Sequence, residues 1–279
     1  MLGNLLLHDS VATLIKALAV NVPQGLLFVG PEGIGKLSVA QALAQQVVDH
    51  PTSIRVISPD EKGTIAIETI RELYKTTRAK QSGQQVVIIE RADRMSLEAE
   101  NAFLKLLEEP RPGLTFMLTA LQLEALLPTI LSRVQHVSLQ PLPDDVIRRF
   151  VVSKKPGIAQ NDLSQLVFLA QGRPGIALAL LTEGALPKHR DRMQLVKQLL
   201  AAKPYERFTL ATKLATSRDE TVETLNAMAH VVEVQLGSAA GPTQAAHWAK
   251  IAEALEEALQ TITHNGNVRA QLLYLFSRY

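Results

Sequence analysis

A glycine-rich stretch near the start of the chain combines the residue types that bind a phosphate group. The segment GPEGIGKLS, residues 30–38, follows the apolar run GLLFV and precedes a segment of helical character. Gly30, Gly33 and Gly35 allow the backbone to turn its N–H groups toward an anion. Lys36 adds a positive charge where a helix begins, and a helix start also favours phosphate. The pattern G-x-x-x-x-G-K therefore predicts a phosphate site, for which ATP or ADP is the candidate ligand.

The position that normally supplies a magnesium ligand carries no hydroxyl. Loops of this kind place Ser or Thr directly after the lysine, and this chain has Leu37 there. Ser38 follows one residue later, rotated by about 100° around the helix. Ser38 remains a candidate for contact with a nucleotide, but it is a poor substitute for the metal ligand, so the usual magnesium site is incomplete.

The acidic element that activates water in such enzymes is incomplete as well. Two adjacent acids normally end a strand, one near the metal and one beside the attacking water. In VVIIERADRM, Glu90 is followed by Arg91, so a cation stands where an acid is needed. Thr119, at the end of the strand FMLT, either faces the γ-phosphate or bonds only to backbone. We expect a loop kept for shape or nucleotide binding; slow hydrolysis through Glu90 and a water molecule is the alternative.

A single arginine near the edge of the same region has a different chemistry. Arg133, in TILSRV, follows a strand and a short helical stretch. A guanidinium presented in this way can stabilise the charge of a transferred phosphoryl group in a neighbouring subunit. The alternative is an ordinary surface arginine in a salt bridge, and the Ser-Arg pair by itself does not decide between the two.

Strands and helices alternate over residues 24–140. Strands are expected in GLLFVG, IRVISP, VVIIE, LTFMLTA and HVSLQPL, and helices between them, including one over IAIETIRELYKTTRAK. This alternation indicates a parallel sheet covered by helices on both faces. After residue 143 the strand pattern disappears. From about residue 187 onward the chain is expected to be helical, with a break at GSAAGP, residues 237–242.

The helix LEAENAFLKLLEE carries clear end signals. Ser96 is expected to cap its first turn. Glu98 and Glu100 lie near its positive end, where a negative charge is favourable. Pro110 and Pro112 are expected to end it.

Composition excludes several classes of function. The chain has 279 residues, 47% of them hydrophobic and 20% charged, which is typical of a folded protein of two or three domains. Because there is no cysteine, disulfides, thiol catalysis and cysteine-ligated zinc are excluded. H-E-x-x-H is absent, so no metal site is expected. G-x-S-x-G is absent as well, so no Ser/His/Asp catalytic site is expected. Without a basic leader or an apolar run of ~20 residues, we expect a cytoplasmic protein with no membrane partner.

Taken together, these motifs resemble the clamp-loader subunits of the AAA+ class, and most closely the delta-prime family of DNA polymerase III. The resemblance rests on PQGLLFVGPEGIGK, ETIREL, VVIIERADRMSLEAENAFLKLLEEP, TFMLTA, LLPTILSRVQ and GRPGIALAL, and more loosely on HNGNVRAQLLYLF. It implies an α/β AAA+ P-loop domain with a parallel sheet at residues 1–142. A small helical lid at 143–183 and an all-helical oligomerisation (collar) domain at 184–279 would follow.

The resemblance also implies a role for Arg133. Within Ser132-Arg133-Val134 it stands where the family presents an arginine finger to ATP bound by the adjacent motor subunit; Val134 replaces the usual cysteine. Gly175 stands where motor subunits carry an arginine that reaches the nucleotide from the lid. The family's four-cysteine zinc module cannot form in this chain, so no zinc is expected.

The implied function is that of a stator subunit of the DNA polymerase III holoenzyme that does not itself hydrolyse ATP. Its expected partners are gamma/tau-type motor subunits, a delta-type wrench subunit, primed DNA and, indirectly, the sliding clamp. Two alternatives stay open: an active AAA+ ATPase of the motor type, and a nucleotide-sensing AAA+ adaptor of another complex. Whether the chain is an enzyme is therefore undecided by its sequence.

Overall fold

The chain forms two compact units, one ending at Thr182 and one beginning at Glu183. The computed structural model describes residues 5–77, 83–109, 111–182, 184–215, 217–263 and 266–278. Each unit is described by itself below. Within the described residues, no helix is both long and apolar enough to cross a membrane.

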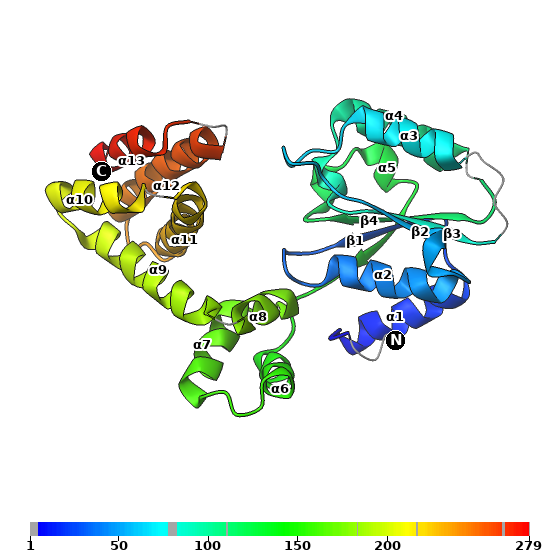
Figure 1. Cartoon of the computed structure of the whole chain (residues 1–279), viewed down its shortest axis with the longest axis horizontal. Coiled ribbons are helices and arrows are strands. Elements are labelled where there is room, and N and C mark those ends of the chain that lie inside the picture. Colours follow the sequence, from blue (N-terminus) through cyan, green and yellow to red (C-terminus); the bar gives the residue numbers. More distant parts are fainter. Residues whose placement is uncertain are drawn as a thin grey trace. The chain divides into compact units, whose positions relative to one another are not determined.

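The first unit is built on a parallel sheet of five strands in the order β2-β3-β4-β1-β5 (Figure 1). The strands are β1 (Gly25–Val29), β2 (Ile54–Ile57), β3 (Gln85–Ile89), β4 (Leu114–Ala120) and β5 (Gln135–Ser138). Because all five run the same way, their carboxyl ends meet at one edge and their amino ends at the other. The predicted parallel sheet and all five predicted strands are confirmed.

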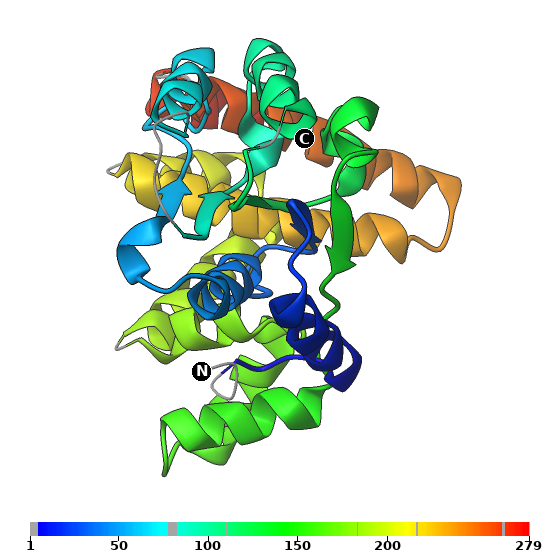
Figure 2. The same cartoon turned by 90° about the vertical axis from the view of Figure 1, so that its right-hand side faces the viewer.

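Helices cover both faces of this sheet (Figures 1 and 2). One face carries α1 (Asp9–Val20) and α2 (Lys36–Val47), and the other carries α3 (Ile67–Thr77), α4 (Leu97–Glu108) and α5 (Pro128–Leu131). Side chains of a strand alternate between the faces. On β1, Leu27 joins the core beneath α3 and α4, whereas Leu26 and Phe28 join the core beneath α1 and α2. Burial on both faces explains why these strands are continuous apolar runs.

Helix α4 begins as predicted. The Ser96 hydroxyl accepts the backbone N–H of Ala99 at 3.2 Å, which caps the first turn. A hydrogen bond from its own backbone N–H, and then the Ser96 hydroxyl, lower the pKa of the Glu98 carboxyl. Glu100 differs from the expectation, because it is only 7% exposed and burial raises the pKa of its carboxyl. The helix ends at Glu108.

Two predictions about helix ends fall partly outside the described residues. Pro110, expected to help end α4, lies outside them, and so do residues 78–82. The predicted extension of α3 to residue 80 therefore lies beyond the described part, in which α3 ends at Thr77.

Three short helices complete the first unit: α6 (Asp144–Lys154), α7 (Gln160–Ala170) and α8 (Pro174–Leu181). They pack on one another through Ile147, Leu166 and Ala177, which are all fully buried. The Leu142 N–H donates to the carbonyl oxygen of Gly172 at 2.8 Å and so ties the segment after β5 to the start of α8. The predicted boundary between residues 142 and 143 stays a prediction.

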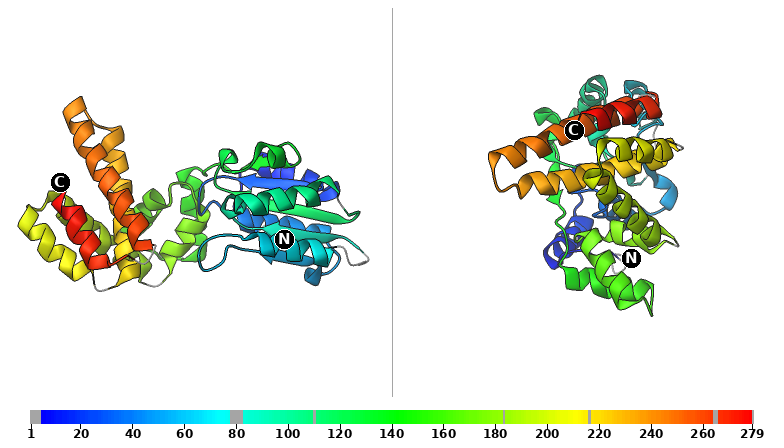
Figure 3. Two further views of the ribbon diagram at one scale, coloured as in Figure 1. Left: turned by 90° about the horizontal axis from the view of Figure 1, so that it is seen from above. Right: turned by 90° about the vertical axis from the view of Figure 1, so that its left-hand side faces the viewer.

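The second unit is all-helical, as predicted. Its helices are α9 (Ala185–Ala201), α10 (Pro204–Leu214), α11 (Arg218–Gly237), α12 (Pro242–Thr263) and α13 (Val268–Ser277). The predicted break at GSAAGP separates α11 from α12, and these two helices run side by side (Figure 3). Their shared core includes Met228, Val232 and Leu255, each with no exposed surface.

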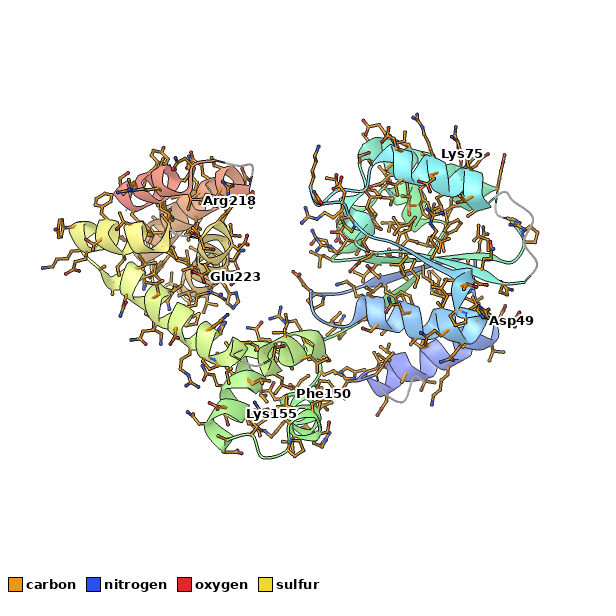
Figure 4. All side chains as sticks on the ribbon, in the orientation of Figure 1. Asp49, Lys75, Phe150, Lys155, Arg218 and Glu223 are labelled. Carbon is orange, nitrogen blue, oxygen red and sulfur yellow. The ribbon has the colours of Figure 1, made fainter. Side chains whose placement is uncertain are left out.

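Polar contacts connect α11 to its neighbours. Glu223 and Arg218 both lie on α11 (Figure 4). Glu223 forms an ion pair with Arg192 of α9. The Arg218 guanidinium donates to the carbonyl oxygen of Ile262, in the last turn of α12, and to that of Gly266 at 3.1 Å. Arg218 thus satisfies carbonyl groups that the end of a helix leaves without partners.

Candidate nucleotide-binding site and arginine turn

The glycine loop, residues 30–36, connects the carboxyl end of β1 to α2. Gly30, Gly33 and Gly35 all have positive φ angles, of 156°, 76° and 101°. Gly35 precedes Lys36, the first residue of α2, so the free backbone N–H groups of the first turn border the loop. This is the strand–loop–helix arrangement that binds a phosphate group through backbone N–H donors.

Lys36 is the buried cation of this loop. It is 8% exposed, and its ammonium group donates to the carbonyl oxygens of Gly30 at 2.7 Å and Pro31 at 3.0 Å. Burial, and then the nearby Arg91 charge, lower the pKa of Lys36. Both effects disfavour a positive charge at this position, and a bound phosphate would offset both. The residues of the loop therefore fit a phosphate group.

A cavity of about 240 Å³ opens beside the loop. Six of the predicted site residues line it: Gly33, Gly35, Lys36, Ser38, Glu90 and Thr119. Gly30 is not in the lining but accepts the Lys36 hydrogen bond. Gly175, from the start of α8, also borders the cavity. The structure thus brings together residues from four separate parts of the first unit: the glycine loop with the start of α2, the ends of β3 and β4, and the start of α8.

A larger cavity, of about 570 Å³, lies elsewhere, between α3 and α4. Its lining includes Ile70, Tyr74 and Ala102 with Arg71 and Lys105, and none of the predicted site residues. We place the candidate site at the smaller cavity, because that is where the anion-binding backbone and the buried lysine meet.

At the end of β3 the charged groups are not arranged as they are in the site of an ATP-hydrolysing enzyme. The Glu90 carboxylate accepts the Ser58 hydroxyl at 2.7 Å. Arg91 follows with φ 53°, and its guanidinium pairs with Asp93 at 3.1 Å. The backbone N–H of Arg91 donates to the Thr119 hydroxyl at 2.9 Å, and Thr119 is 1% exposed. This contact favours the backbone role for Thr119 over contact with a γ-phosphate.

The residues present do not fit the usual magnesium site. Leu37 packs against the core beneath α1 and α2, and Ser38 is exposed. Across the part of the chain that the structure describes, no group of three His, Asp or Glu side chains is placed to hold a metal ion. A nucleotide at this loop would therefore be held by backbone N–H groups and Lys36.

The start of α8 contacts the loop directly. The backbone N–H of Gly175 donates to the carbonyl oxygen of Gly33 at 2.7 Å. A Cβ atom at position 175 would lie 2.7 Å from that same oxygen, so only glycine fits here without displacement. An arginine, which the family's motor subunits carry at this position, is sterically excluded from this arrangement.

Arg133 lies in a second cluster, which we call the arginine turn, residues 127–133. Its guanidinium donates to Glu108 at 2.9 Å, to the carbonyl oxygen of Thr129 at 2.9 Å and to the Ser132 hydroxyl at 3.1 Å. The salt-bridge geometry is thus present, with the Arg133 side chain 37% exposed and the Glu108 side chain 49% exposed. Val134, in place of the family's cysteine, is buried beneath α3–α5.

The arginine turn and the glycine loop lie at opposite edges of the sheet. β1 and β5 are parallel, with Gln135 beside Leu26. Arg133 therefore precedes the amino ends of the strands, whereas the glycine loop follows their carboxyl ends. At ~3.3 Å per residue, a five-residue strand separates the two by roughly 16 Å. Arg133 cannot reach a phosphate bound at the loop of its own chain.

Sequence reasoning did not identify Ser58, Asp93 or Glu108 as members of these clusters. Asp93 was recognisable in principle, because an acid two residues after Arg91 can pair with it. Ser58 is hydrogen-bonded to Glu90, 32 positions away, and Glu108 to Arg133, 25 positions away, so no local sequence pattern identifies them.

Comparisons with known proteins agree with the resemblance seen in the motifs. Residues 49–143 match the family described as DNA polymerase III, delta subunit. DNA polymerase III subunit delta′ of Haemophilus influenzae is 29% identical over 189 residues, which are 60% of this chain and 57% of that protein. The Pseudomonas aeruginosa subunit of the same name is 30% identical over 200 residues, 62% of this chain and 60% of that one. The matches thus span less than two thirds of these relatives.

A solved structure matches over nearly the whole chain. The gamma subunit-related protein of DNA polymerase III from Thermotoga maritima has a TM-score of 0.61 and 20% identity. The match covers 96% of this chain and 98% of that one. At this identity the likeness establishes the fold.

Proposed function

We propose that this chain, which belongs to the DNA polymerase III delta′ family, is a clamp-loader subunit that lends Arg133 to a neighbour's ATP site and does not hydrolyse ATP itself. The observation that carries the proposal is the separation of Arg133 from the glycine loop of its own chain. An arginine at the amino edge of the sheet can serve phosphoryl chemistry only in another subunit.

The loss of hydrolysis is supported by the surroundings of the glycine loop. Leu37 offers no oxygen to magnesium, and Arg91 stands where a second acid would activate water. The Glu90 carboxylate is already hydrogen-bonded by Ser58. Without a positioned metal and an activated water, two contributions that phosphoanhydride hydrolysis normally needs are missing. The loop can still hold the phosphates of ATP or ADP.

The role of Arg133 in trans is supported by its exposure and its donors. A guanidinium has five N–H donors in a planar fork. Three hydrogen bonds to α4 and to its own turn hold it in one orientation at the surface. A preorganised, partly exposed cation of this kind stabilises developing phosphoryl charge at little cost in side-chain entropy.

The proposal includes the assembly around the chain. The AAA+ domain at 1–142 and the lid at 143–183 would contact neighbouring subunits, and the helices of 184–279 would form the collar. The partners are gamma/tau-type motor subunits, a delta-type subunit, primed DNA and, indirectly, the sliding clamp, in the cytoplasm. Contact with DNA would be mainly to phosphates and independent of sequence.

The test is a reconstituted loader containing wild-type or Arg133→Ala chain with the other loader subunits of the same organism. Arginine fingers contribute about 10³–10⁵-fold to the turnover of one site. Because a loader has several sites, we expect a clear loss of DNA-stimulated ATPase activity rather than its abolition. The Arg269→Ala variant, which removes an exposed arginine from α13, is the control. Unchanged turnover with Arg133→Ala would refute the proposal.

An active ATPase of the motor type is the second candidate, favoured by the complete G-x-x-x-x-G-K pattern and the cavity beside it. It predicts phosphate release by the isolated chain that Lys36→Ala abolishes. The third, a nucleotide-sensing adaptor of another complex, predicts that the chain does not assemble with loader subunits at all.

A further inference from the structure

Helix α4 holds the arginine turn at both of its ends. At the start of the turn, the backbone N–H of Leu127 donates to the Glu100 carboxylate at 2.9 Å. At its end, the Arg133 guanidinium donates to the Glu108 carboxylate at 2.9 Å. The two acids are about two helical turns apart on α4. The four-residue helix α5 lies between these two contacts, so α4 helps to orient it.

The two ends of the turn differ in burial. Glu100 is 7% exposed, so its contact with Leu127 is part of the interior. The Glu108 side chain is 49% exposed and that of Arg133 is 37% exposed. The first contact therefore sets the position of the turn, whereas the second is open to exchange with another anion.

The two terminal nitrogens of Arg133 donate to different partners, so the bond to Glu108 can be exchanged for a bond to another anion. One terminal nitrogen, Nη1, donates to its own turn, at Thr129 and Ser132. The other, Nη2, donates to Glu108. A phosphate oxygen can replace the Glu108 carboxylate at Nη2 while the bonds of Nη1 are kept, because Glu108 accepts from Nη2 alone and phosphate is an equally suitable acceptor for a guanidinium.

We propose that the Glu108 carboxylate pairs with Arg133 and holds its guanidinium in place until the phosphate of a nucleotide bound to the adjacent subunit displaces the carboxylate. This inference rests on the proposed function and adds a regulatory element to it. Glu108 is a positioning residue that competes with the phosphate. Removing its charge therefore makes the arginine available at a lower nucleotide concentration.

The test uses the reconstituted loader with Glu108→Gln, which keeps the side-chain length and an acceptor oxygen but removes the charge. An exposed ion pair of ~0.2–1 kcal/mol corresponds to a change of about 1.4- to 5-fold. We expect the KM for ATP to fall by about 1.4- to 5-fold while kcat stays unchanged within the error of the assay. A purely structural contact would lower kcat and leave KM unchanged, so this split distinguishes the two roles.

Two further variants complete the experiment. Glu124→Gln removes an equal charge from an exposed position on the neighbouring turn, Leu123–Ala125, and should leave KM unchanged. Arg133→Ala with Glu108→Gln should show the same KM as Arg133→Ala alone, because Glu108 acts only through the arginine.

The outcomes separate this inference from the proposed function. A loss of activity with Arg133→Ala, together with an unchanged or raised KM for Glu108→Gln, refutes the role of Glu108 and leaves the arginine finger intact. Unchanged activity with Arg133→Ala refutes the proposed function and this inference with it. An equal fall in KM for Glu124→Gln would assign the effect to surface charge in general and would also refute the role of Glu108.

Discussion

The backbone N–H of Gly175 donates a 2.7 Å hydrogen bond to the carbonyl oxygen of Gly33, although the two glycines are far apart in the chain. Through this contact the start of α8 closes one side of the candidate nucleotide site. The absence of a Cβ atom at position 175 is what permits so close an approach.

The first prediction concerns this contact. Gly175→Ala should lower the free energy of unfolding by about 1–3 kcal/mol, because its Cβ would lie 2.7 Å from the Gly33 oxygen and force the two backbones apart. Chemical denaturation of the isolated chain measures the effect. Gly237→Ala, at the last residue of α11 where a Cβ meets no atom within 4 Å, is the matched control. Equal effects of the two variants would show that the glycine contact contributes nothing specific.

The second prediction concerns nucleotide binding. ATP or ADP should raise the unfolding midpoint of the wild-type chain, by an amount equivalent to about 2.7 kcal/mol at a ligand concentration of 100 Kd. Because Leu37 provides no metal ligand, the shift should not require magnesium. Lys36→Met should abolish it, and without nucleotide this variant should be at least as stable as wild type, since burial of the Lys36 charge is unfavourable.

The control for this experiment is Lys105→Met, which removes an exposed lysine on α4. It should retain the full nucleotide shift. No shift of the wild-type chain with either nucleotide would mean that the loop is kept for its shape.

The third prediction concerns pH. Burial raises the pKa of the Glu100 carboxyl in the folded chain. Between its unfolded pKa, near ~4.3, and the higher folded value, the folded state holds more protons than the unfolded state. The contribution of Glu100 to stability therefore falls as pH rises through this window. Glu100→Gln, which keeps an acceptor for the Leu127 N–H, should gain stability relative to wild type between pH 4 and pH 7. Urea unfolding at several pH values tests this, and a difference that does not vary with pH would contradict it.

The fourth prediction concerns the helical unit. Arg218→Ala removes two charge-assisted hydrogen bonds, to the carbonyl oxygens of Ile262 and Gly266. We expect a loss of about 1.5–3 kcal/mol in unfolding free energy. Arg218→Lys should recover only part of it, because an ammonium group cannot reproduce the planar fork. Denaturant unfolding of the isolated chain measures both variants. A loss within about 0.5 kcal/mol for Arg218→Ala would mean that solvent replaces these bonds without cost.

Much of the fold was predictable because its signals are local. The five apolar strands, the Ser96 cap and the break between α11 and α12 each follow from the spacing of apolar residues or from one residue's backbone preference. The glycine loop was predictable for the same reason, since its conformation depends mainly on the glycines of residues 30–36.

Glu100 illustrates where local reasoning failed. Its position in the first turn of α4 predicted a negative charge that the positive end of the helix favours. Packing against the arginine turn buries it instead, and its partner is the N–H of Leu127, 27 residues away. Desolvation by burial outweighs this hydrogen bond and raises the pKa of the Glu100 carboxyl.

By itself the amino-acid sequence determined the elements, the glycine loop and the absence of a hydroxyl at Leu37, because each depends on the types of adjacent residues. Only the tertiary structure decided the strand order, the contact of Gly33 with Gly175, and the pairing of Arg133 with Glu108. These depend on distances between groups that only the packing of the chain brings together, and a linear pattern carries no record of such distances.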